Sequence, residues 1–411
     1  MRTDGERHRG WRSRRRAGRA RGRRTPALVA VVAVIAASGL AGCGKPAEKT
    51  TPGATASAEL AAQLDAAVTQ VMKDFDIPGA VVGISVPGKV DYVKTFGVAD
   101  RATGTPMRLD DHIRIGSLTK TFTGTAVLQL VDQKRIALSD PISKYVPGVP
   151  SGDKITLQML GEMRSGLFTY DDDKQWQKSI LTELPKGPSA GAVTAQQLLD
   201  VAFRHPLKFE PGTQYDYSNT NAVLLGMVVE KVSGLSLPDY LQQHIFTPLK
   251  LTRTSWPSDG NMPAPYAHGY TNQTVDGTVA DATLWNPSWA NAAGQLISTY
   301  ADMKTWDVAL GKGSLLSAET QKKRLEAKEV VPGNPAYKYG FAIIESHGWI
   351  GHTGVIFGYT SAVFSIPAQN ATMTIFATSS ILKPDKTPQA PAEHLAKVVS
   401  SIVTPDHVYS Q

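Results

Sequence analysis

The sequence reads Ile115-Gly116-Ser117-Leu118-Thr119-Lys120-Thr121-Phe122-Thr123 at the start of a stretch whose apolar residues recur at helical spacing. Residues three apart on a helix share a face, so Ser117 and Lys120 would lie side by side. A lysine in a desolvated cleft loses its proton more readily and can deprotonate a serine hydroxyl. The segment therefore predicts Ser117 as a nucleophile and Lys120 as its base. The alternative is that Ser117 only caps the helix.

Ser-x-x-Lys also occurs at Ser151–Lys154 and Ser380–Lys383. The first lies between prolines and glycines, where a helical turn is disfavoured, and the second runs directly into Pro384. We interpret both as accidental occurrences.

Two further patterns carry candidate chemistry. Tyr217-Ser218-Asn219 lies before an apolar helical stretch, and a similar triplet, Tyr270-Thr271-Asn272, occurs later. A tyrosine near a lysine can relay a proton to a leaving group, and an asparagine amide can hold both lysine and substrate. Taken alone, Tyr217 could equally be a packing residue and Asn219 a helix cap.

The triplet His352-Thr353-Gly354 occurs once. Glycines at 351 and 354 would let this backbone approach a ligand closely on an edge strand. Histidine and threonine can donate hydrogen bonds to a substrate carboxylate or carbonyl. A single histidine in a strand can also be purely structural.

The pattern of expected elements indicates the fold class. We expect strands near both chain ends and helices between them, at the following residues: helix 58–75; strands 80–86 and 90–98; helices after Lys120, at 194–203 and at 221–232; strands 339–344, 348–351, 359–366 and 372–377; and helix 392–403. This arrangement predicts an α/β fold with a mixed sheet flanked by helices, built from both chain ends, with an all-helical subdomain inserted.

The three triplets, in this order, resemble those of the serine β-lactamase and D-alanyl-D-alanine carboxypeptidase superfamily. The nearest likeness is to class C β-lactamase-like hydrolases and actinobacterial DD-peptidases, several of which carry His-Thr-Gly in place of Lys-Thr-Gly. The likeness covers residues 60–403 and includes the following additional segments: Leu138 to Pro147, Phe209 to Gly212, Leu224 to Gly226 and Ala293 to Thr299.

The resemblance implies acyl transfer in a cleft between the sheet domain and the helical subdomain. Ser117 would attack a carbonyl with Lys120 as base, Tyr217 would pass a proton to the leaving group, and Asn219 would orient Lys120 and the substrate. The oxyanion would lie between the backbone N–H groups of Ser117 and Val355.

The resemblance also implies that His352, Thr353 and Gly354 form the part of the site that holds the substrate's carboxylate end. If His352 acts there as a cation, activity should fall as the pH rises past its pKa.

Two departures from the family pattern affect the expected cleft. Glu162-Met163-Arg164-Ser165-Gly166-Leu167 replaces a common Thr-His-Thr-Ser-Gly-Leu at the cleft floor, and Gln295 replaces a usual glycine and could narrow one wall.

The acidic run Asp171-Asp172-Asp173 is interpreted as a solvated loop, and no His pair has metal-ligand spacing. We expect no metal and no cofactor.

The N-terminus indicates export. Residues 1–24 contain eleven arginines and two acidic residues, and the apolar run 27–37 matches a signal-peptide core. Leu40-Ala41-Gly42-Cys43 resembles a lipobox, and Cys43 is the only cysteine. We expect residues 1–42 to be a lipoprotein signal peptide, 43–57 a flexible tether and 58–411 a hydrolase domain. The protein would be secreted and attached through a lipid on Cys43 to the outer face of the cytoplasmic membrane. Because the rest of the chain is slightly acidic, nucleic-acid binding is not indicated.

The first functional hypothesis is a D-alanyl-D-alanine carboxypeptidase acting on cell-wall peptides as a monomer through a Ser117 acyl-enzyme. The alternatives are a β-lactamase and an esterase or D-amino-acid peptidase. A further, non-enzymatic alternative is a lipoprotein that binds penicillin or cell-wall peptide without turnover.

Overall fold

The structure is a computed structural model that describes residues 55–383 and 390–410. The predicted signal peptide, Cys43 and the tether up to residue 54 lie outside the described residues.

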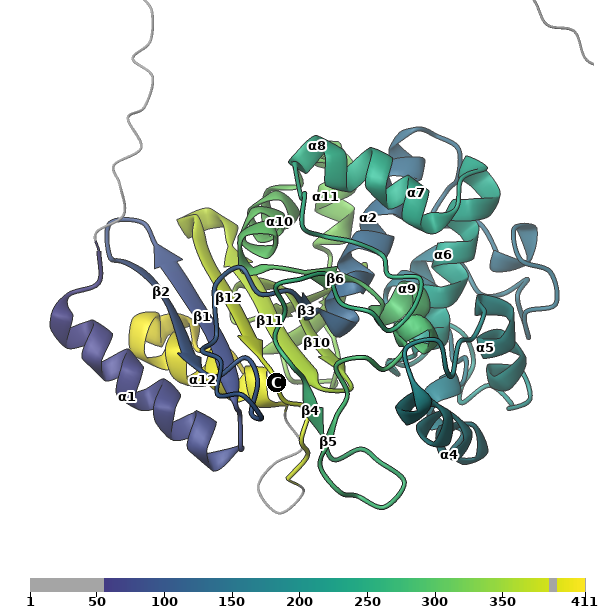
Figure 1. Cartoon of the computed structure of the whole chain (residues 1–411). Helices are drawn as coiled ribbons and strands as arrows, with labels where there is room; N and C mark the ends of the chain where they lie inside the picture. Colours follow the sequence, from purple (N-terminus) through teal and green to yellow (C-terminus); the bar gives the residue numbers. More distant parts are fainter. Residues whose placement is uncertain (1–54, 384–389, 411) are drawn as a thin grey trace, which may run out of the picture. The chain divides into compact units, whose positions relative to one another are not determined.

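An antiparallel sheet of eight strands, in the order β2-β1-β12-β11-β10-β9-β8-β7, is the framework of the fold (Figure 1). The N-terminal strand β1 lies beside the C-terminal strand β12, with Val82 opposite Ile375. The predicted α/β fold, with a sheet built from both chain ends, is therefore confirmed. The strands are β1 Gly79–Val86, β2 Val90–Gly97, β7 Lys328–Glu329, β8 Tyr337–Gly340, β9 Ile343–Ser346, β10 Trp349–Ile356, β11 Tyr359–Ile366 and β12 Ala371–Ala377.

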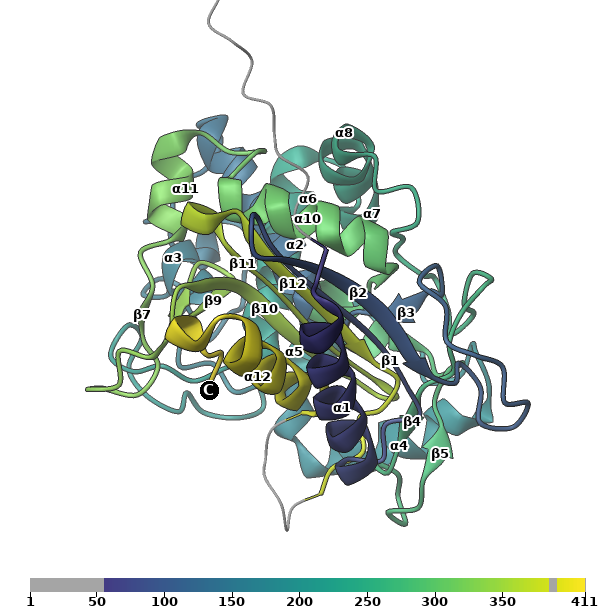
Figure 2. The ribbon, with the colours of Figure 1, turned by 90° about the vertical axis from the view of Figure 1, so that its left-hand side faces the viewer.

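Helices cover both faces of this sheet. The terminal helices α1 (Ala58–Asp74) and α12 (Pro391–Val403) pack on one face, where Figure 2 shows them in front of the strands. Their apolar residues, such as Leu64 and Val399, form a core with the strand side chains. On the other face α10 (Tyr300–Lys312) packs against β11 and β12 and belongs to a second, larger core.

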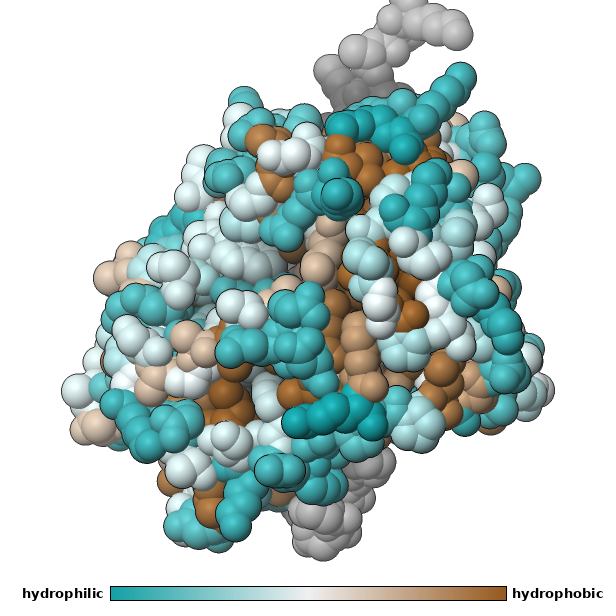
Figure 3. Space-filling view, turned by 90° about the vertical axis from the view of Figure 1, so that its right-hand side faces the viewer, coloured by the Kyte–Doolittle hydropathy of each residue, from teal (hydrophilic) through white to brown (hydrophobic). Residues whose placement is uncertain are grey.

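Residues between β2 and β7 form the helical region. Its centre is the contact between α2 (Thr119–Asp132) and α6 (Asn219–Ser233), both of which are rich in buried residues. Figure 3 shows the side of the molecule that carries this region, where hydrophobic residues surface as separate patches among hydrophilic ones. The remaining helices are α3 Leu157–Gly161, α4 Lys174–Glu183, α5 Ala195–Ala202, α7 Leu237–Leu241, α8 Thr247–Leu249, α9 Asn291–Gly294 and α11 Ala318–Arg324. Short strand pairs join β3 Ile113–Arg114 to β6 Ile297–Ser298 and β4 Tyr270–Thr271 to β5 Ala280–Asp281.

Two expected strands differ from those observed. The expected strand 339–344 is divided into β8 and β9 because Ala342 has a φ of 54°, which ends the extended backbone. The expected strand 348–351 instead continues to Ile356, so His352-Thr353-Gly354 lies in the middle of β10.

Within the described residues, no single helix is long and apolar enough to span a bilayer. One bent pair, Asn219–Ser233 with Leu237–Leu249, meets the length and composition criteria only when the two helices are combined.

Candidate active site

Ser117 and Lys120 lie together at the start of α2. A short turn, Gly116–Leu118, leads into the helix, so that Ser117 precedes Lys120 by one turn. The Lys120 Nζ donates to Ser117 Oγ at 3.0 Å and to the carbonyl oxygen of Ala293 at 2.8 Å. Burial lowers the pKa of Lys120 to about 7, although the negative charge of Asp171 acts in the opposite direction. The lysine can therefore be neutral, and able to accept a proton, near neutral pH.

The backbone of β10 lies directly against this turn. A Cβ on Gly116 would come within 2.7 Å of the Val355 backbone nitrogen, and a Cβ on Gly354 within 2.0 Å of the Ile115 carbonyl oxygen. Gly116 also has a φ of 54°, in the left-handed region that glycine adopts most readily. Two glycines thus permit the close approach that places the Val355 backbone beside Ser117.

Tyr217 lies over the lysine. The Lys120 Nζ is 4.8 Å from the centre of the Tyr217 ring, and the tyrosine is adjacent to Ser117. Burial raises the pKa of Tyr217 well above its ordinary value, while the Ser117 hydroxyl lowers it by a smaller amount. Among the described residues its hydroxyl has no well-formed hydrogen bond. It is therefore a protonated hydroxyl beside the serine.

Asn219 does not make the predicted contact with Lys120. Its Nδ2 donates to Asp171 at 2.8 Å, and its backbone N–H donates to Thr169 Oγ1 at 3.0 Å. The lysine's own hydrogen bonds go to Ser117 and to a carbonyl. The Asn219 Oδ1 is buried and has no hydrogen-bond partner among the described residues, so the expectation that Asn219 orients Lys120 and the substrate stays a prediction.

His352 is buried and neutral. Burial and the nearby charge of Lys120 lower its pKa to about 3, although the hydrogen bond to the Thr353 backbone acts in the opposite direction. Its Nδ1 is hydrogen-bonded to the Thr353 carbonyl oxygen, and its Nε2 lies 3.0 Å from the Tyr339 hydroxyl. This low pKa argues against the expected cationic His352, and the expected fall of activity as pH rises past its pKa stays a prediction.

Six of the predicted site residues line a cavity of about 510 Å³, and Lys120 and Gly354 are not among its lining residues. Ser117, Tyr217, Asn219, His352, Thr353 and Val355 all line this cavity. Its other lining residues are Asp171, Tyr215, Gln273, Trp289, Val330, Tyr337, Ile344, Ile356, Phe357 and Glu393.

The sequence interpretation missed Asp171 and Tyr339. Asp171 was assigned to a solvated acidic loop, but its carboxylate lines the cavity and accepts from Asn219. A single acidic residue within an acidic run gives no signal that distinguishes it from its neighbours. Tyr339 lies thirteen residues before His352, and only the pairing of β8 through β9 with β10 brings the two together.

The two departures from the family pattern have clear structural places. Gln295 is buried and donates to the carbonyl oxygen of Pro257 at 2.8 Å, and it is not among the residues that line the cavity. The expectation that it narrows a wall is therefore wrong. Met163, in the replaced cleft-floor segment, accepts a long hydrogen bond from Asn221 on α6 at 3.4 Å and is buried.

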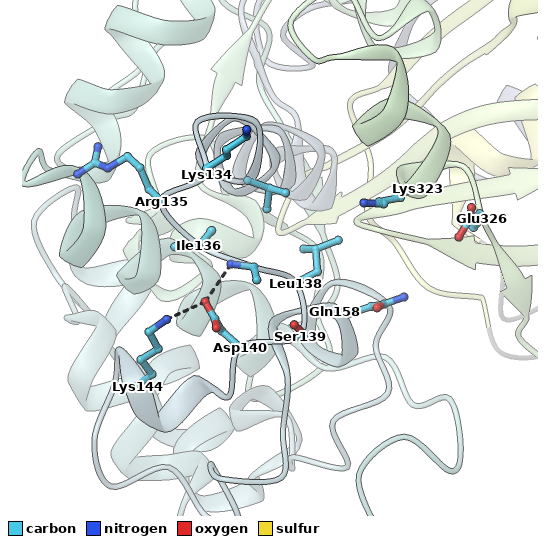
Figure 4. A pocket seen from close by; sticks show the side chains of 12 residues that line it. Lys134, Arg135, Ile136, Leu138, Ser139, Asp140, Lys144, Gln158, Lys323 and Glu326 are labelled. Atoms are coloured by element: carbon cyan, nitrogen blue, oxygen red, sulfur yellow. Dashed lines mark hydrogen bonds and ion pairs between the residues drawn. The ribbon is translucent and has the colours of Figure 1, made fainter.

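A second cavity, of about 670 Å³, lies at the end of α2 (Figure 4). Lys134, Arg135 and Lys323 line it, and Asp140 is hydrogen-bonded to Lys144 there. This cavity contains none of the predicted catalytic residues. Among the described residues, no group of three or more His, Cys, Asp or Glu is arranged to hold a metal ion.

Fold and site together define a serine hydrolase of the β-lactamase type: a Ser-Lys pair at a helix start, a buried tyrosine and a close-packed strand carrying His-Thr-Gly. The Beta-lactamase family model matches residues 64–397. The chain belongs to this family.

Known proteins similar to this chain include amide hydrolases. A D-stereospecific amidohydrolase from a Streptomyces species is 31% identical, with a TM-score of 0.71 over 83% of this chain and 98% of that one. D-amino acid amidase from Ochrobactrum anthropi SV3, complexed with D-phenylalanine, is 26% identical, with a TM-score of 0.72 over 84% and 99% of the two chains. Protein flp of Staphylococcus aureus (strain MRSA252) is 25% identical over 326 residues, which span 77% of this chain but only 62% of flp.

Proposed function

We propose that this protein hydrolyses amides of D-amino acids through a Ser117 acyl-enzyme. The observation that carries the proposal is the charge of the described cavity wall, where His352 is neutral and the carboxylate of Asp171 is present. Such a wall suits a substrate with a free amino group better than one with a free carboxylate. The similarity to a D-stereospecific amidohydrolase and a D-amino acid amidase supports the same substrate class.

The reaction begins with proton transfer. Lys120, neutral near pH 7, takes the proton of the Ser117 hydroxyl as the oxygen attacks the amide carbonyl. The resulting oxyanion would be bound by the backbone N–H groups of Ser117 and Val355, a role supported by the close approach of β10 to the turn before α2.

Collapse of this intermediate breaks the C–N bond. The Tyr217 hydroxyl, which burial keeps protonated, gives its proton to the departing amine and is reprotonated from Lys120. Water then attacks the ester with the same groups acting in reverse, and Thr353 holds the substrate from the strand side.

D-alanyl-D-alanine carboxypeptidase activity is the second candidate. Thr353 favours it, because a hydroxyl that lines the cavity can donate to a substrate carboxylate. A neutral His352 weakens it, because the carboxylate would then lack the cation that His352 was expected to supply.

The test compares D-phenylalanine amide, L-phenylalanine amide and an acyl-D-alanyl-D-alanine peptide, with Ser117→Ala as the inactive control. We expect kcat/KM to be highest for the D-amide. A preference for the acyl peptide would replace the proposal with the carboxypeptidase. Intact mass spectrometry with a penicillin completes the comparison: consumption without an adduct would indicate a β-lactamase, and binding without turnover of any substrate a binding protein.

A further inference from the structure

Tyr339 lies behind the active site and does not line its cavity. Its ring is buried, and its hydroxyl oxygen lies 3.0 Å from His352 Nε2. The two rings meet edge to face, with centroids 5.7 Å apart and planes at 89°. This side of the imidazole therefore faces a tyrosine within the protein.

The hydrogen-bond partners assign the tautomer of His352. A carbonyl oxygen can only accept, so the bond between Nδ1 and the Thr353 carbonyl places a hydrogen on Nδ1. In a neutral ring Nε2 is then an acceptor, and the Tyr339 hydroxyl must be its donor. Burial and the neighbouring tyrosines raise the pKa of Tyr339 well above its ordinary value, so this donor keeps its proton throughout the physiological range.

The charged groups around Tyr339 and His352 disfavour protonation of His352. Lys120 on α2 faces His352 and lowers its pKa, and Tyr217 lies against the same ring at a centroid distance of 6.2 Å. On the far side, the guanidinium of Arg324 on α11 lies near Tyr339 and is held by Thr121 and Thr125 of α2. Protonation of His352 would add a positive charge close to Lys120 and disfavour protonation of the lysine.

Two tyrosines that line the cavity are also neighbours of Tyr339. Tyr215 and Tyr337 lie near Tyr339, and the burial of each raises its pKa, so neither supplies a negative charge in the physiological range. The negative charge of Asp171 raises the pKa of Lys120 and of Tyr217.

We propose that Tyr339 is a positioning residue: its hydroxyl holds His352 neutral in the Nδ1–H tautomer, with Nε2 turned toward the protein interior. As a consequence, Lys120 is the group beside Ser117 that binds the proton, and His352 does not compete for it. The inference rests on the proposed function only for its kinetic test, since the tautomer can be measured without a substrate.

The direct test is nitrogen-15 NMR of protein labelled in the histidine rings. The chain has nine histidines, and loss of signals in His352→Gln assigns those of residue 352. We expect the unmodified protein to show a protonated Nδ1 and a hydrogen-bonded, unprotonated Nε2 at every pH from 5 to 8. A protonated Nε2, or a titration within this range, in the signals assigned to His352 would overturn the proposal whether or not Tyr339→Phe folds.

Tyr339→Phe removes only the hydroxyl. We expect its His352 signals to show mixed tautomers or a titration between pH 5 and 7, because Nε2 loses its donor. Tyr92→Phe is the matched control, since it deletes a buried tyrosine's hydrogen bond to Asp65, at 2.7 Å, in α1. Unchanged His352 signals in folded Tyr339→Phe would contradict the proposal.

Kinetics provide the second measurement. With D-phenylalanine amide we expect Tyr339→Phe to lower kcat/KM about threefold to tenfold, the range for loss of one neutral hydrogen bond. In a His352→Gln background the same change should have no further effect. Fully additive losses would show that Tyr339 does not act through His352. Absence of amide hydrolysis would instead count against the proposed function and leave the NMR result standing.

Discussion

At the scale of single residues, the charge state of Lys120 sets the chemistry. Its ammonium is buried among a serine hydroxyl, a carbonyl and a tyrosine ring, and burial lowers its pKa to about 7. Only the neutral amine can take the serine proton. Because deprotonation of a lysine increases with pH, the active fraction must rise as pH passes through this pKa.

We therefore expect kcat/KM to increase with pH between about 6 and 8, with a single acidic limb near 7. This is the opposite of the fall expected for a cationic His352. Lys120→Arg should lower kcat/KM by about a thousandfold, because a guanidinium stays protonated. A pH series with wild-type protein and this variant measures both effects, and a flat wild-type profile from pH 5 to 8 would contradict the role.

Residue chemistry was predictable where it follows from local sequence. The spacing in Ser117-x-x-Lys120 placed both side chains on one helical face, as observed. The partners of Asn219 and His352 were not predictable, because Asp171 and Tyr339 reach them from other elements. Whether a histidine is charged depends on burial and on neighbouring charge, neither of which a triplet reveals.

At the scale of elements, the contact between β10 and the turn before α2 shapes the site. Gly354 allows it, because an added Cβ would lie 2.0 Å from the Ile115 carbonyl oxygen and 2.4 Å from Ser361 Oγ. These two oxygen atoms are hydrogen-bonded to each other, since Ser361 Oγ donates to the Ile115 carbonyl oxygen at 2.9 Å. Substitution must therefore move one backbone relative to the other.

We expect Gly354→Ala to lower kcat by at least about a hundredfold, because separating Val355 from Ser117 removes one oxyanion donor. Gly351→Ala is the control on the same strand. Its Cβ would meet the Val363 carbonyl oxygen at 2.0 Å, on the neighbouring strand β11 and away from the nucleophile. Both variants should lose stability, measured by thermal unfolding. Equal losses of kcat per folded molecule would show that the β10 contact has no special role.

Element boundaries followed from the sequence where apolar periodicity was regular. The helices at 58–75 and 392–403 were predicted to within a residue at each end. The strand before His352 was expected to span 348–351, whereas β10 continues to Ile356, and the glycines at 351 and 354 were expected to let the backbone approach a ligand. Those glycines serve close packing of the strand against other backbone, and this cannot be distinguished from a strand end without the tertiary structure.

At the scale of the whole molecule, the burial of Asp307 lowers the free energy of unfolding. It lies on α10, fully buried against the sheet, and neither carboxylate oxygen has a well-formed hydrogen bond among the described residues. Burial raises its pKa well above the ordinary value, although the Ser365 hydroxyl and the Met373 N–H act in the opposite direction. The folded protein therefore holds a proton that the unfolded chain releases above about pH 4.

The sign of the pH dependence follows from this difference. When the folded state binds more protons, the free energy of unfolding falls as pH rises, by up to about 1.4 kcal/mol per pH unit between the two pKa values. Asp307→Asn removes the titration and keeps the side-chain shape. We therefore expect the variant to be more stable than wild type at pH 8, with the difference shrinking as the pH approaches 4.

Denaturant unfolding at a series of pH values measures this difference, and a second aspartate on the same helix provides the control. Asp302 accepts from the Arg253 N–H and the Thr254 hydroxyl, each at 2.8 Å, so Asp302→Asn should destabilise the protein. If Asp307→Asn followed the wild-type pH dependence, Asp307 would have to be ionised in the folded state. A buried carboxylate would then require a partner cation that α10 and the sheet do not provide among the described residues.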